Sequence, residues 1–280
     1  MSKNSLINLH FDGHMHTRYC HHATGTMEEY VLSAIEKGLD HIVFLEHMEA
    51  TGVNYFETTW LTDKDFDDYF EEGEKLQEKY GDQLNIGLGV EVGYNAAQQQ
   101  ELQDRLRRRS WDQVGISYHF MPVPGQSFNL NLVSRKEENI LAIAETGCES
   151  VLNNYFDTLM EAVRVLPGTV LCHLDAALRF QPGLQLTQNH WQQIEELLDT
   201  VKEQNMALEI NTSGFAIRGT PFPDPAIIQM AINRRIPLVA GSDAHRPEDV
   251  GRYFHKLPEL LDQLSTLRQT RPWPLLMMPH

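Results

Sequence analysis

Seven short apolar runs alternate with stretches of helical periodicity along the whole chain, and this alternation is what most limits the possible folds. Strands that alternate with helices pair in parallel and are joined by right-handed crossovers. The order therefore predicts an α/β protein with seven parallel strands in a barrel. The expected strands are residues 9–14, 41–47, 84–92, 112–119, 169–174, 206–211 and 236–243.

The segments between these strands carry helix signals. The stretch 27–37 has Thr26 in position to cap its start and Gly38 directly after its end. The other expected helices are residues 65–79, 96–109, 136–165, 188–203, 224–234 and a last one from residue 247 onward. No linker rich in Pro, Gly or Ser divides the chain, so we expect a single domain over residues 1–280.

The composition narrows the class of protein. Apolar side chains make up 41% of the chain, and no run approaches the roughly 18 apolar residues of a membrane span, so we expect a cytoplasmic protein without a membrane partner. The formal charge of −16 disfavours nucleic acid and favours a small or cationic substrate, although bound cations would offset it locally. The three cysteines form no CxxC pair, which argues against a disulfide framework.

Histidines stand at the ends of the apolar runs. In parallel barrels the carboxyl ends of the strands face a common mouth, where catalytic groups collect. His14 and His16 would share one face of an extended strand, so that one ion could take both imidazoles. Of the neighbours His21 and His22, we expect only one to be a ligand.

Carboxylates accompany the histidines at other strand ends. Glu46 directly precedes His47 and could bind a metal or hold an imidazole in one tautomer. Asp243 stands two residues before His245 and suits direct ligation or the positioning of water. Glu91 lies among apolar and glycine residues, where burial is costly without a cation, and its two oxygens could bridge two ions.

His119 and His173 each end an apolar strand. A single histidine in such a place is more often a hydrogen-bonded core residue than a ligand. Their occurrence together with the other strand-end groups favours metal ligation for both.

Two arginines and two long connections would border the mouth. Arg179 and Arg218 are candidate phosphate ligands, because a guanidinium binds phosphate oxygens in a bidentate way, and ordinary surface arginines are the alternative. The connections 48–64 and 120–135 are long for a compact domain and follow ligand-bearing strands, so they are candidate lids.

These residues together resemble the polymerase and histidinol phosphatase (PHP) family. The motifs HxH, EH, GxE, H, H and GSDAH occur in that order over nearly the whole chain. More narrowly, the segments DGHMHTRYCHH, GVEVGY, HLDAALRF and EINTSG look like those of the monofunctional histidinol-phosphate phosphatases. The resemblance implies a distorted seven-stranded (β/α) barrel with a PHP fold and three divalent metal ions per chain, of zinc, iron or manganese.

The resemblance also implies a division of the ligands. His22 is preferred to His21 because it stands six residues beyond His16. The implied ligands are His14, His16, Glu91 and Asp243 for a first ion, Glu91, His119 and His173 for a second, and His22, His47 and His245 for a third.

Further residues take supporting or catalytic roles by the same resemblance. Arg179 and Arg218 fall where such phosphatases bind the substrate phosphate, and proton transfer is left open between Asp243 and a neighbouring histidine such as His245. Glu46 and Glu209 are expected to support ligands rather than to bind metal.

The expected function is metal-dependent hydrolysis of a phosphomonoester, with L-histidinol phosphate as the substrate, in histidine biosynthesis. One alternative is a PHP phosphoesterase acting on nucleoside bisphosphates or oligonucleotide ends, which the acidic charge disfavours. An amidohydrolase-type barrel also begins with HxH, but Glu91 stands where its bridging lysine would be expected. A third alternative is a metal-binding module without turnover, and the paired arginines argue against it. The oligomeric state is left open.

Overall fold

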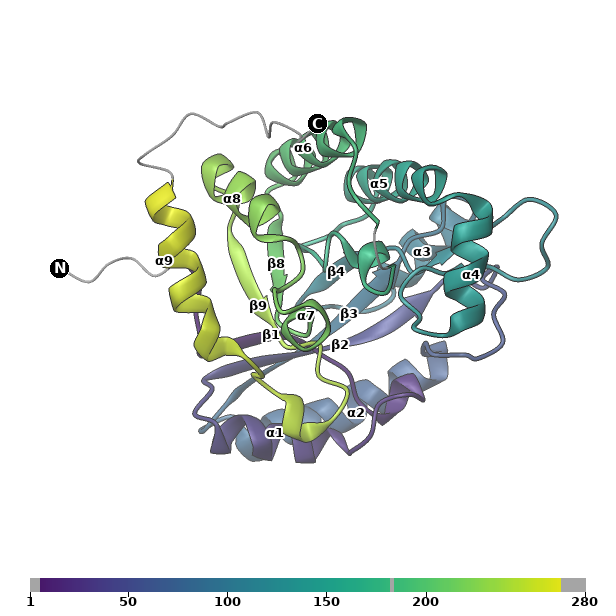
Figure 1. Ribbon diagram of the computed structural model, residues 1–280. Coiled ribbons are helices and arrows are strands. Elements are labelled where there is room, and N and C mark those ends of the chain that lie inside the picture. Colours follow the sequence, from purple (N-terminus) through teal and green to yellow (C-terminus); the bar gives the residue numbers. More distant parts are fainter. Residues whose placement is uncertain (1–5, 182–183, 268–280) are drawn as a thin grey trace.

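Seven parallel strands form the centre of the molecule in the computed structural model, which describes residues 6–181 and 184–267 (Figure 1). The strands lie in the order of their position along the chain, so each crossover joins neighbours. They are β1 (Phe11–Met15), β2 (His41–Glu49), β3 (Asn85–Gly93), β4 (Val114–Ser117), β7 (Val170–Leu171), β8 (Ala207–Asn211) and β9 (Leu238–Gly241).

The last strand returns to the first and nearly closes the barrel. The backbone N–H of Asp243 donates to the carbonyl of His14 at 2.8 Å, and that of His16 donates to Ala244 at 2.9 Å. The predicted barrel of parallel strands is thereby confirmed, and its closure brings the first and last candidate ligands of the sequence together.

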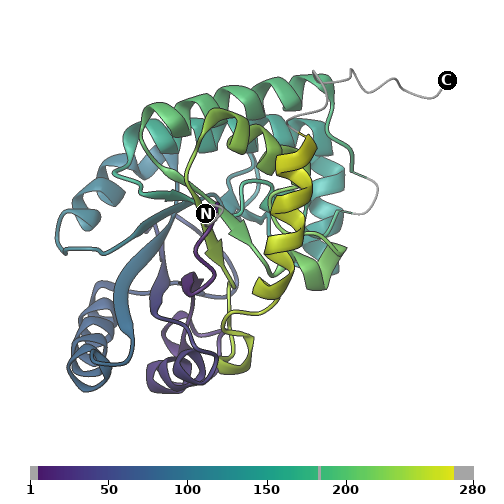
Figure 2. The same ribbon diagram turned by 90° about the vertical axis from the view of Figure 1, so that its left-hand side faces the viewer.

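Helices surround the strands, as the view in Figure 2 shows. Three of them begin with a complete capping box, at Thr26, Thr62 and Thr187, which explains why the chain turns into a helix at these points. The helices are α1 (Met27–Glu36), α2 (Asp63–Tyr80), α3 (Gln99–Leu106), α4 (Glu137–Thr146), α5 (Cys148–Val165), α6 (Gln188–Glu203), α7 (Gly214–Arg218), α8 (Pro225–Arg234) and α9 (Leu257–Leu267). Short 3₁₀ turns cover Arg18–Cys20, Ala96–Gln98, Ala176–Leu178, Pro247–Asp249 and Phe254–Lys256.

Several element boundaries differ from the sequence-based expectation. The strand expected over 169–174 is limited to Val170–Leu171, because His173 leaves the extended conformation with a φ of 21°. The helix expected over 136–165 is two helices, because the chain turns at Gly147 with a φ of 95°. The last helix begins at Leu257 rather than at residue 247.

The connection 120–135 also contains structure that the sequence did not predict. It forms a short antiparallel pair of β5 (Phe120–Met121) and β6 (Leu130–Asn131). Within the described residues, every helix is too short or too polar to cross a membrane.

Candidate metal centre

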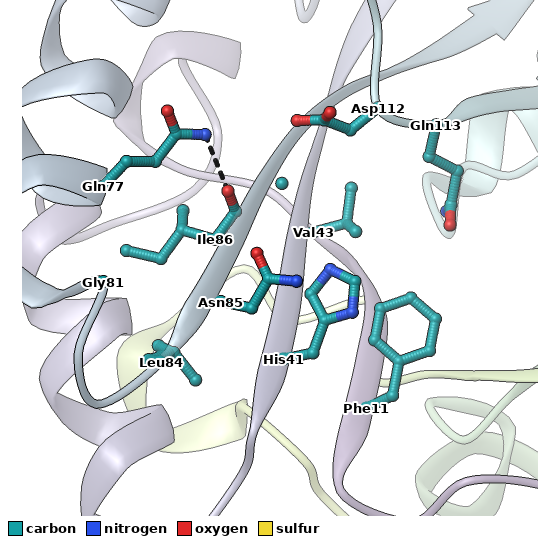
Figure 3. A pocket seen from close by; sticks show the side chains of 11 residues that line it. Phe11, His41, Val43, Gln77, Gly81, Leu84, Asn85, Ile86, Asp112 and Gln113 are labelled. Atoms are coloured by element: carbon teal, nitrogen blue, oxygen red, sulfur yellow. Dashed lines mark hydrogen bonds between the residues drawn. The ribbon is translucent and has the colours of Figure 1, made fainter.

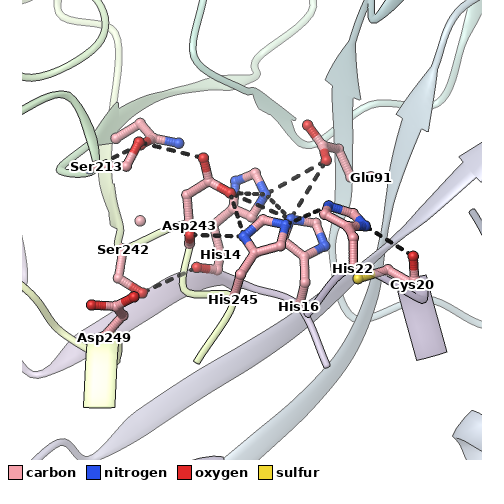
Figure 4. Close-up of polar contacts among 12 residues, drawn as sticks. His14, His16, Cys20, His22, Glu91, Ser213, Ser242, Asp243, His245 and Asp249 are labelled. Atoms are coloured by element: carbon pink, nitrogen blue, oxygen red, sulfur yellow. Dashed lines mark hydrogen bonds and ion pairs between the residues drawn. The ribbon is translucent and has the colours of Figure 1, made fainter. Parts of the chain in front are cut away.

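The candidate ligands converge at the carboxyl ends of the strands, around one cavity of about 580 Å³. Figure 4 shows part of this cluster: His14, His16, His22, Glu91, Asp243 and His245. They come from strands and loops far apart in the sequence, and the barrel places them at one mouth. The cavity is lined by His22, His47, Glu91, His119, His173, Arg179, Asp243 and His245, among others. His14 and His16 lie behind this wall and are almost completely buried.

Glu91 lies at the centre of the cluster and is 1% exposed. Its Oε1 lies 2.7 Å from Nε2 of His173 and 3.2 Å from Nε2 of His119. Its Oε2 lies 2.8 Å from Nδ1 of His47. The two oxygens of one carboxylate therefore face different imidazoles, and residue 91 is placed opposite residue 47 by the register of β2 and β3.

A second group joins the first strand to the last. His14 and His16 face each other with their Nε2 atoms 2.9 Å apart. Oδ1 of Asp243 lies 3.5 Å from Nε2 of His16 and 4.0 Å from that of His14. Oε2 of Glu91 lies 3.6 Å and 3.7 Å from the same two nitrogens, so this group shares Glu91 with the first.

A third group lies at the outer edge. Nε2 of His22 is 2.8 Å from Nε2 of His245, and the ring of His47 stacks on that of His16. Burial lowers the pKa of His22 to about 4 and that of His245 to about 3, so both rings are neutral, the form that binds a metal. Of the two adjacent histidines, His22 lines the cavity with these ligands.

The donor sets fit divalent ions of the kind that the sequence suggested. Several sets of three ligand atoms lie within 4.8 Å of one another, a span compatible with bonds of about 2.0–2.2 Å to a common ion. They include His14, His16 and Asp243; His14, Glu91 and His173; His16, His47 and His245; and Cys20, His22 and His245. Mixed imidazole and carboxylate ligands suit zinc, iron and manganese alike.

The central carboxyls are held in the charged form that binds cations. Burial opposes ionisation of Glu91, but the imidazoles of His119 and His14 outweigh it and hold the pKa of Glu91 well below its usual range. Burial likewise opposes ionisation of Asp243, and the hydrogen bond to His16 keeps the pKa of Asp243 well below normal.

Buried carboxylates support the ligands from behind. Oε1 of Glu209 lies 2.6 Å from Nδ1 of His14, and its Oε2 accepts the backbone N–H of His173 at 2.7 Å. Glu46 accepts both the backbone N–H and the hydroxyl of Thr17. Glu209 thus contacts two candidate ligands, whereas the hydrogen bonds of Glu46 go to Thr17, and its Oε2 lies 3.9 Å from Nδ1 of His16.

Glu49 is a site residue that the sequence analysis missed. Its Oε1 lies 2.9 Å from Nδ1 of His119, and its side chain is 2% exposed. A signal was present, because Glu49 stands two residues after His47 and therefore on the same face of β2.

The backbone at two ligands is in the left-handed region. Asp243 has a φ of 51°, and His173 has a φ of 21°. Residues other than glycine adopt such angles at a cost, and they cluster at functional sites. At Asp243, two backbone contacts hold this turn, since its N–H donates to His14 and its carbonyl accepts from Arg252 at 2.8 Å.

The two candidate phosphate ligands occupy different surroundings. Arg179 lines the cavity, with Nη2 at 3.4 Å from Oδ2 of Asp243. Arg218 donates from Nη1 to Oδ2 of the buried Asp175 at 2.8 Å and from Nη2 to the carbonyl of Pro221. Both guanidinium groups lie over the ring of Phe222, at 4.9 Å and 4.1 Å. The structure therefore brings Arg179 to the candidate ligand Asp243 and pairs Arg218 with Asp175.

Three further cationic side chains line the cavity: Arg135, Lys136 and Arg246. The sequence did not indicate a role for them. Lys136 is paired with Glu57 at 2.6 Å. These cations stand beside the carboxylates that also line the cavity, so the mouth carries charges of both signs.

The two candidate lids lie against each other at the mouth. The backbone N–H of Asn129 donates to the carbonyl of Asn54 at 2.9 Å, and the amide of Asn54 donates to Ser127 at 2.8 Å. The rings of Phe56 and Phe128 are 4.0 Å apart. The two connections thus form one cover over one side of the cavity.

A second hollow, of about 620 Å³, lies at the opposite end of the barrel (Figure 3). Phe11, His41 and Asn85, which begin β1, β2 and β3, line it together with Asp112. Because active sites of parallel barrels form at the carboxyl ends of the strands, the ligand-bearing mouth is the better candidate.

Comparisons with known proteins agree with this geometry. The chain matches the family model described as PHP domain over residues 12–213 and the model described as PHP-associated over residues 226–267. A relative from Deinococcus radiodurans, named a probable histidinol-phosphatase, is 29% identical over 259 residues, which cover 90% of this chain and 92% of the relative.

Two crystal structures share the fold. The HisK structure from Listeria monocytogenes has a TM-score of 0.79 at 24% identity, and the match covers 88% of this chain and 99% of that chain. A histidinol phosphate phosphatase from Lactococcus lactis, in complex with zinc, L-histidinol and phosphate, has a TM-score of 0.67 at 21% identity, with 91% and 93% covered.

Proposed function

Because the chain belongs to the PHP domain family, we propose that it is a metal-dependent phosphomonoester hydrolase whose substrate is L-histidinol phosphate. The proposal draws its substrate from the relatives, several of which are named histidinol-phosphatases and match about nine-tenths of this chain. The observation that carries it is Glu91, a buried carboxylate with three imidazole nitrogens within 3.2 Å, at the wall of a cavity that an arginine also lines.

We propose three divalent ions at this site, of zinc, iron or manganese. His14, His16, Glu91 and Asp243 would hold the first, Glu91, His119 and His173 the second, and His22, His47 and His245 the third. In support, His14, His16 and Asp243 lie close enough to share one ion, Glu91 lies as close to His173, and His47 lies as close to His245. Such ions supply Lewis acidity, which neutralises charge on phosphate oxygens and makes water a better nucleophile near neutral pH.

The residues of the chain bind and orient the substrate. Arg179 is placed to donate to phosphate oxygens, because its guanidinium lies beside Asp243 at the cavity wall. Arg218 would reach the phosphate only by exchanging its bond to Asp175, so we propose a secondary role for it. Asp243 and His245 are the proposed proton carriers: Nδ1 of His245 lies 3.5 Å from Oδ1 of Asp243, and both line the cavity.

The two connections form one wall of the cavity. Tyr55 and Glu57 of the first connection and Phe120 of the second line the cavity. The carboxylate of Glu57 would bind the ammonium group of histidinol by exchanging its bond to Lys136, and the aromatic rings suit the imidazole of histidinol. We propose that the organic half of the substrate lies on this side, in a cytoplasmic enzyme of histidine biosynthesis.

The test is phosphate release by the metal-reconstituted protein from a panel of substrates. We expect kcat/KM for L-histidinol phosphate to exceed that for nucleoside bisphosphates and for oligonucleotide ends. The His173→Ala variant, which lacks a proposed ligand, should lose nearly all turnover. Comparable turnover of nucleotides would favour the alternative phosphoesterase, and no turnover of any ester by a metal-loaded protein would favour a binding module.

A further inference from the structure

Two carboxylates at the mouth each reach across one strand to a histidine on the strand beyond. Glu209 stands on β8, and its partner His14 stands on β1, beyond β9. Glu49 is the last residue of β2, and its partner His119 follows β4, beyond β3. In both pairs the carboxylate faces Nδ1 of the ring, at 2.6 Å and 2.9 Å.

A glycine on the intervening strand makes room for each carboxylate. A Cβ atom added at Gly93 of β3 would overlap both carboxylate oxygens of Glu49. A Cβ atom added at Gly241 of β9 would overlap Oε1 of Glu209. The same arrangement of carboxylate, glycine and histidine therefore occurs twice in the barrel, around β3 and around β9.

We propose that Glu49 is a positioning residue for His119 and that Gly93 is required because it leaves the space through which the Glu49 carboxylate reaches. A carboxylate at Nδ1 fixes the proton there, leaves Nε2 free and sets the direction of the ring. Nε2 of His119 then points at Oε1 of Glu91, 3.2 Å away. The role of His119 as a ligand rests on the proposed function.

The main chain at Glu49 is held independently of its carboxylate. Its carbonyl accepts a hydrogen bond of 2.6 Å from Nη1 of the buried Arg105, and β2 pairs with β3 up to Gly93. A change of the Glu49 side chain should therefore leave the strand end in place. It would remove the partner of Nδ1 of His119 and change the part of the cavity wall that Glu49 lines.

The test compares four single variants by their affinity for zinc, measured by competition with a chromophoric chelator. Glu49→Ala removes the acceptor, and we expect affinity to fall about 10- to 100-fold, the usual effect of losing such a partner. Glu49→Gln keeps an oxygen that can accept the bond, so it should recover part of the loss. Gly93→Ala should resemble Glu49→Ala, although it removes no polar atom.

Gly87→Ala is the matched control for the added methyl group. Gly87 lies on the same strand, and its added Cβ would press against Val43, far from the mouth. We expect this variant to keep the wild-type zinc affinity, whatever its effect on the thermal midpoint. Equal losses of affinity in Gly87→Ala and Gly93→Ala would overturn the proposal, as would unchanged affinity in Glu49→Ala.

The double variant Glu49→Ala/Gly93→Ala gives the sharpest result. If the methyl group acts by displacing the carboxylate, Gly93→Ala should cost almost nothing further once the carboxylate is gone. Multiplicative losses would contradict this mechanism. Zinc affinity is measured without substrate, so this test does not depend on turnover. A wild-type protein that binds zinc but leaves L-histidinol phosphate intact would refute the proposed function. The comparison of variants would still decide the role of Glu49.

Discussion

At the scale of single residues, the histidines proposed as ligands differ in the ring nitrogen that they present. His14 and His119 present Nε2, because a carboxylate faces their Nδ1, whereas His47 presents Nδ1 to Glu91. The sequence identified all three as candidates, but it could not give this choice. The choice depends on Glu209 and Glu49, whose contacts skip one strand of the barrel.

The two arginines should respond differently to truncation. Arg179→Ala should lower kcat/KM for L-histidinol phosphate about 10- to 100-fold, because a hydrogen bond to a charged group contributes about 1.5–3 kcal/mol. Arg218→Ala should mainly lower the thermal midpoint, since it leaves the buried carboxylate of Asp175 without its cation. Steady-state kinetics and calorimetry of both variants check this. A different result would place Arg218 on the phosphate. In that case Arg218→Ala would keep normal stability, and its activity would fall as far as that of Arg179→Ala.

Glu46 should make stability depend on pH in the metal-free protein. Burial raises its pKa from 4.5 to about 8. Because the pKa is higher in the folded state, the contribution of Glu46 to stability is fully present below about pH 4.5 and is lost as the pH rises through about 8. We expect the thermal midpoint of the wild type to fall relative to that of Glu46→Gln over this interval. Parallel midpoints for the two proteins at every pH would show that the carboxyl does not titrate there.

At the scale of elements, the sequence predicted the strands better than their ends. Apolar runs located all seven barrel strands, because each is buried. The strand at 169–174 was shortened by the left-handed turn at His173, and a histidine gives no local signal for such a turn. The pair of β5 and β6 was missed because it is held by contacts with the other lid, such as Asn54 with Asn129.

The start of α2 offers a test of the capping that sets these elements. Thr62 accepts from the backbone N–H of Asp65, and the carboxylate of Asp65 accepts from Thr62 in return. Thr62→Ala should lower the free energy of unfolding by about 1 kcal/mol, because it leaves a helix-start N–H without its partner. Chemical denaturation measures the change. Thr62→Ser keeps the hydroxyl and should stay close to the wild type; an equal loss in both variants would assign the effect to the lost methyl group.

At the scale of the whole molecule, the candidate centre depends on closure of the barrel. His14 and His16 come from the first strand, and Asp243 and His245 follow the last. These pairs meet because Asp243 and Ala244 bond to the backbone of β1. The sequence could predict that strand ends share a mouth, but the distances between the ligands follow from this closure.

Removal of metal should therefore weaken the whole fold. Ions that bind only the folded state stabilise it by about 4 kcal/mol at a thousandfold excess over Kd. For a chain of this size, we expect dialysis against a chelator to lower the thermal midpoint by several degrees, and added zinc or manganese to restore it. His173→Ala serves as the control, since its midpoint should respond less to added metal. A midpoint that is unchanged by the chelator would indicate that closure does not depend on bound ions.

Glu91 is proposed to lie between ions held by ligands from all parts of the chain. The most direct measurement is anomalous diffraction from crystals of the metal-loaded protein. We expect peaks about 2.0–2.2 Å from each carboxylate oxygen of Glu91, with His173 or His119 on one side and His14 or His16 on the other. A single peak that leaves Glu91 uncoordinated, or peaks outside the mouth, would contradict this proposal.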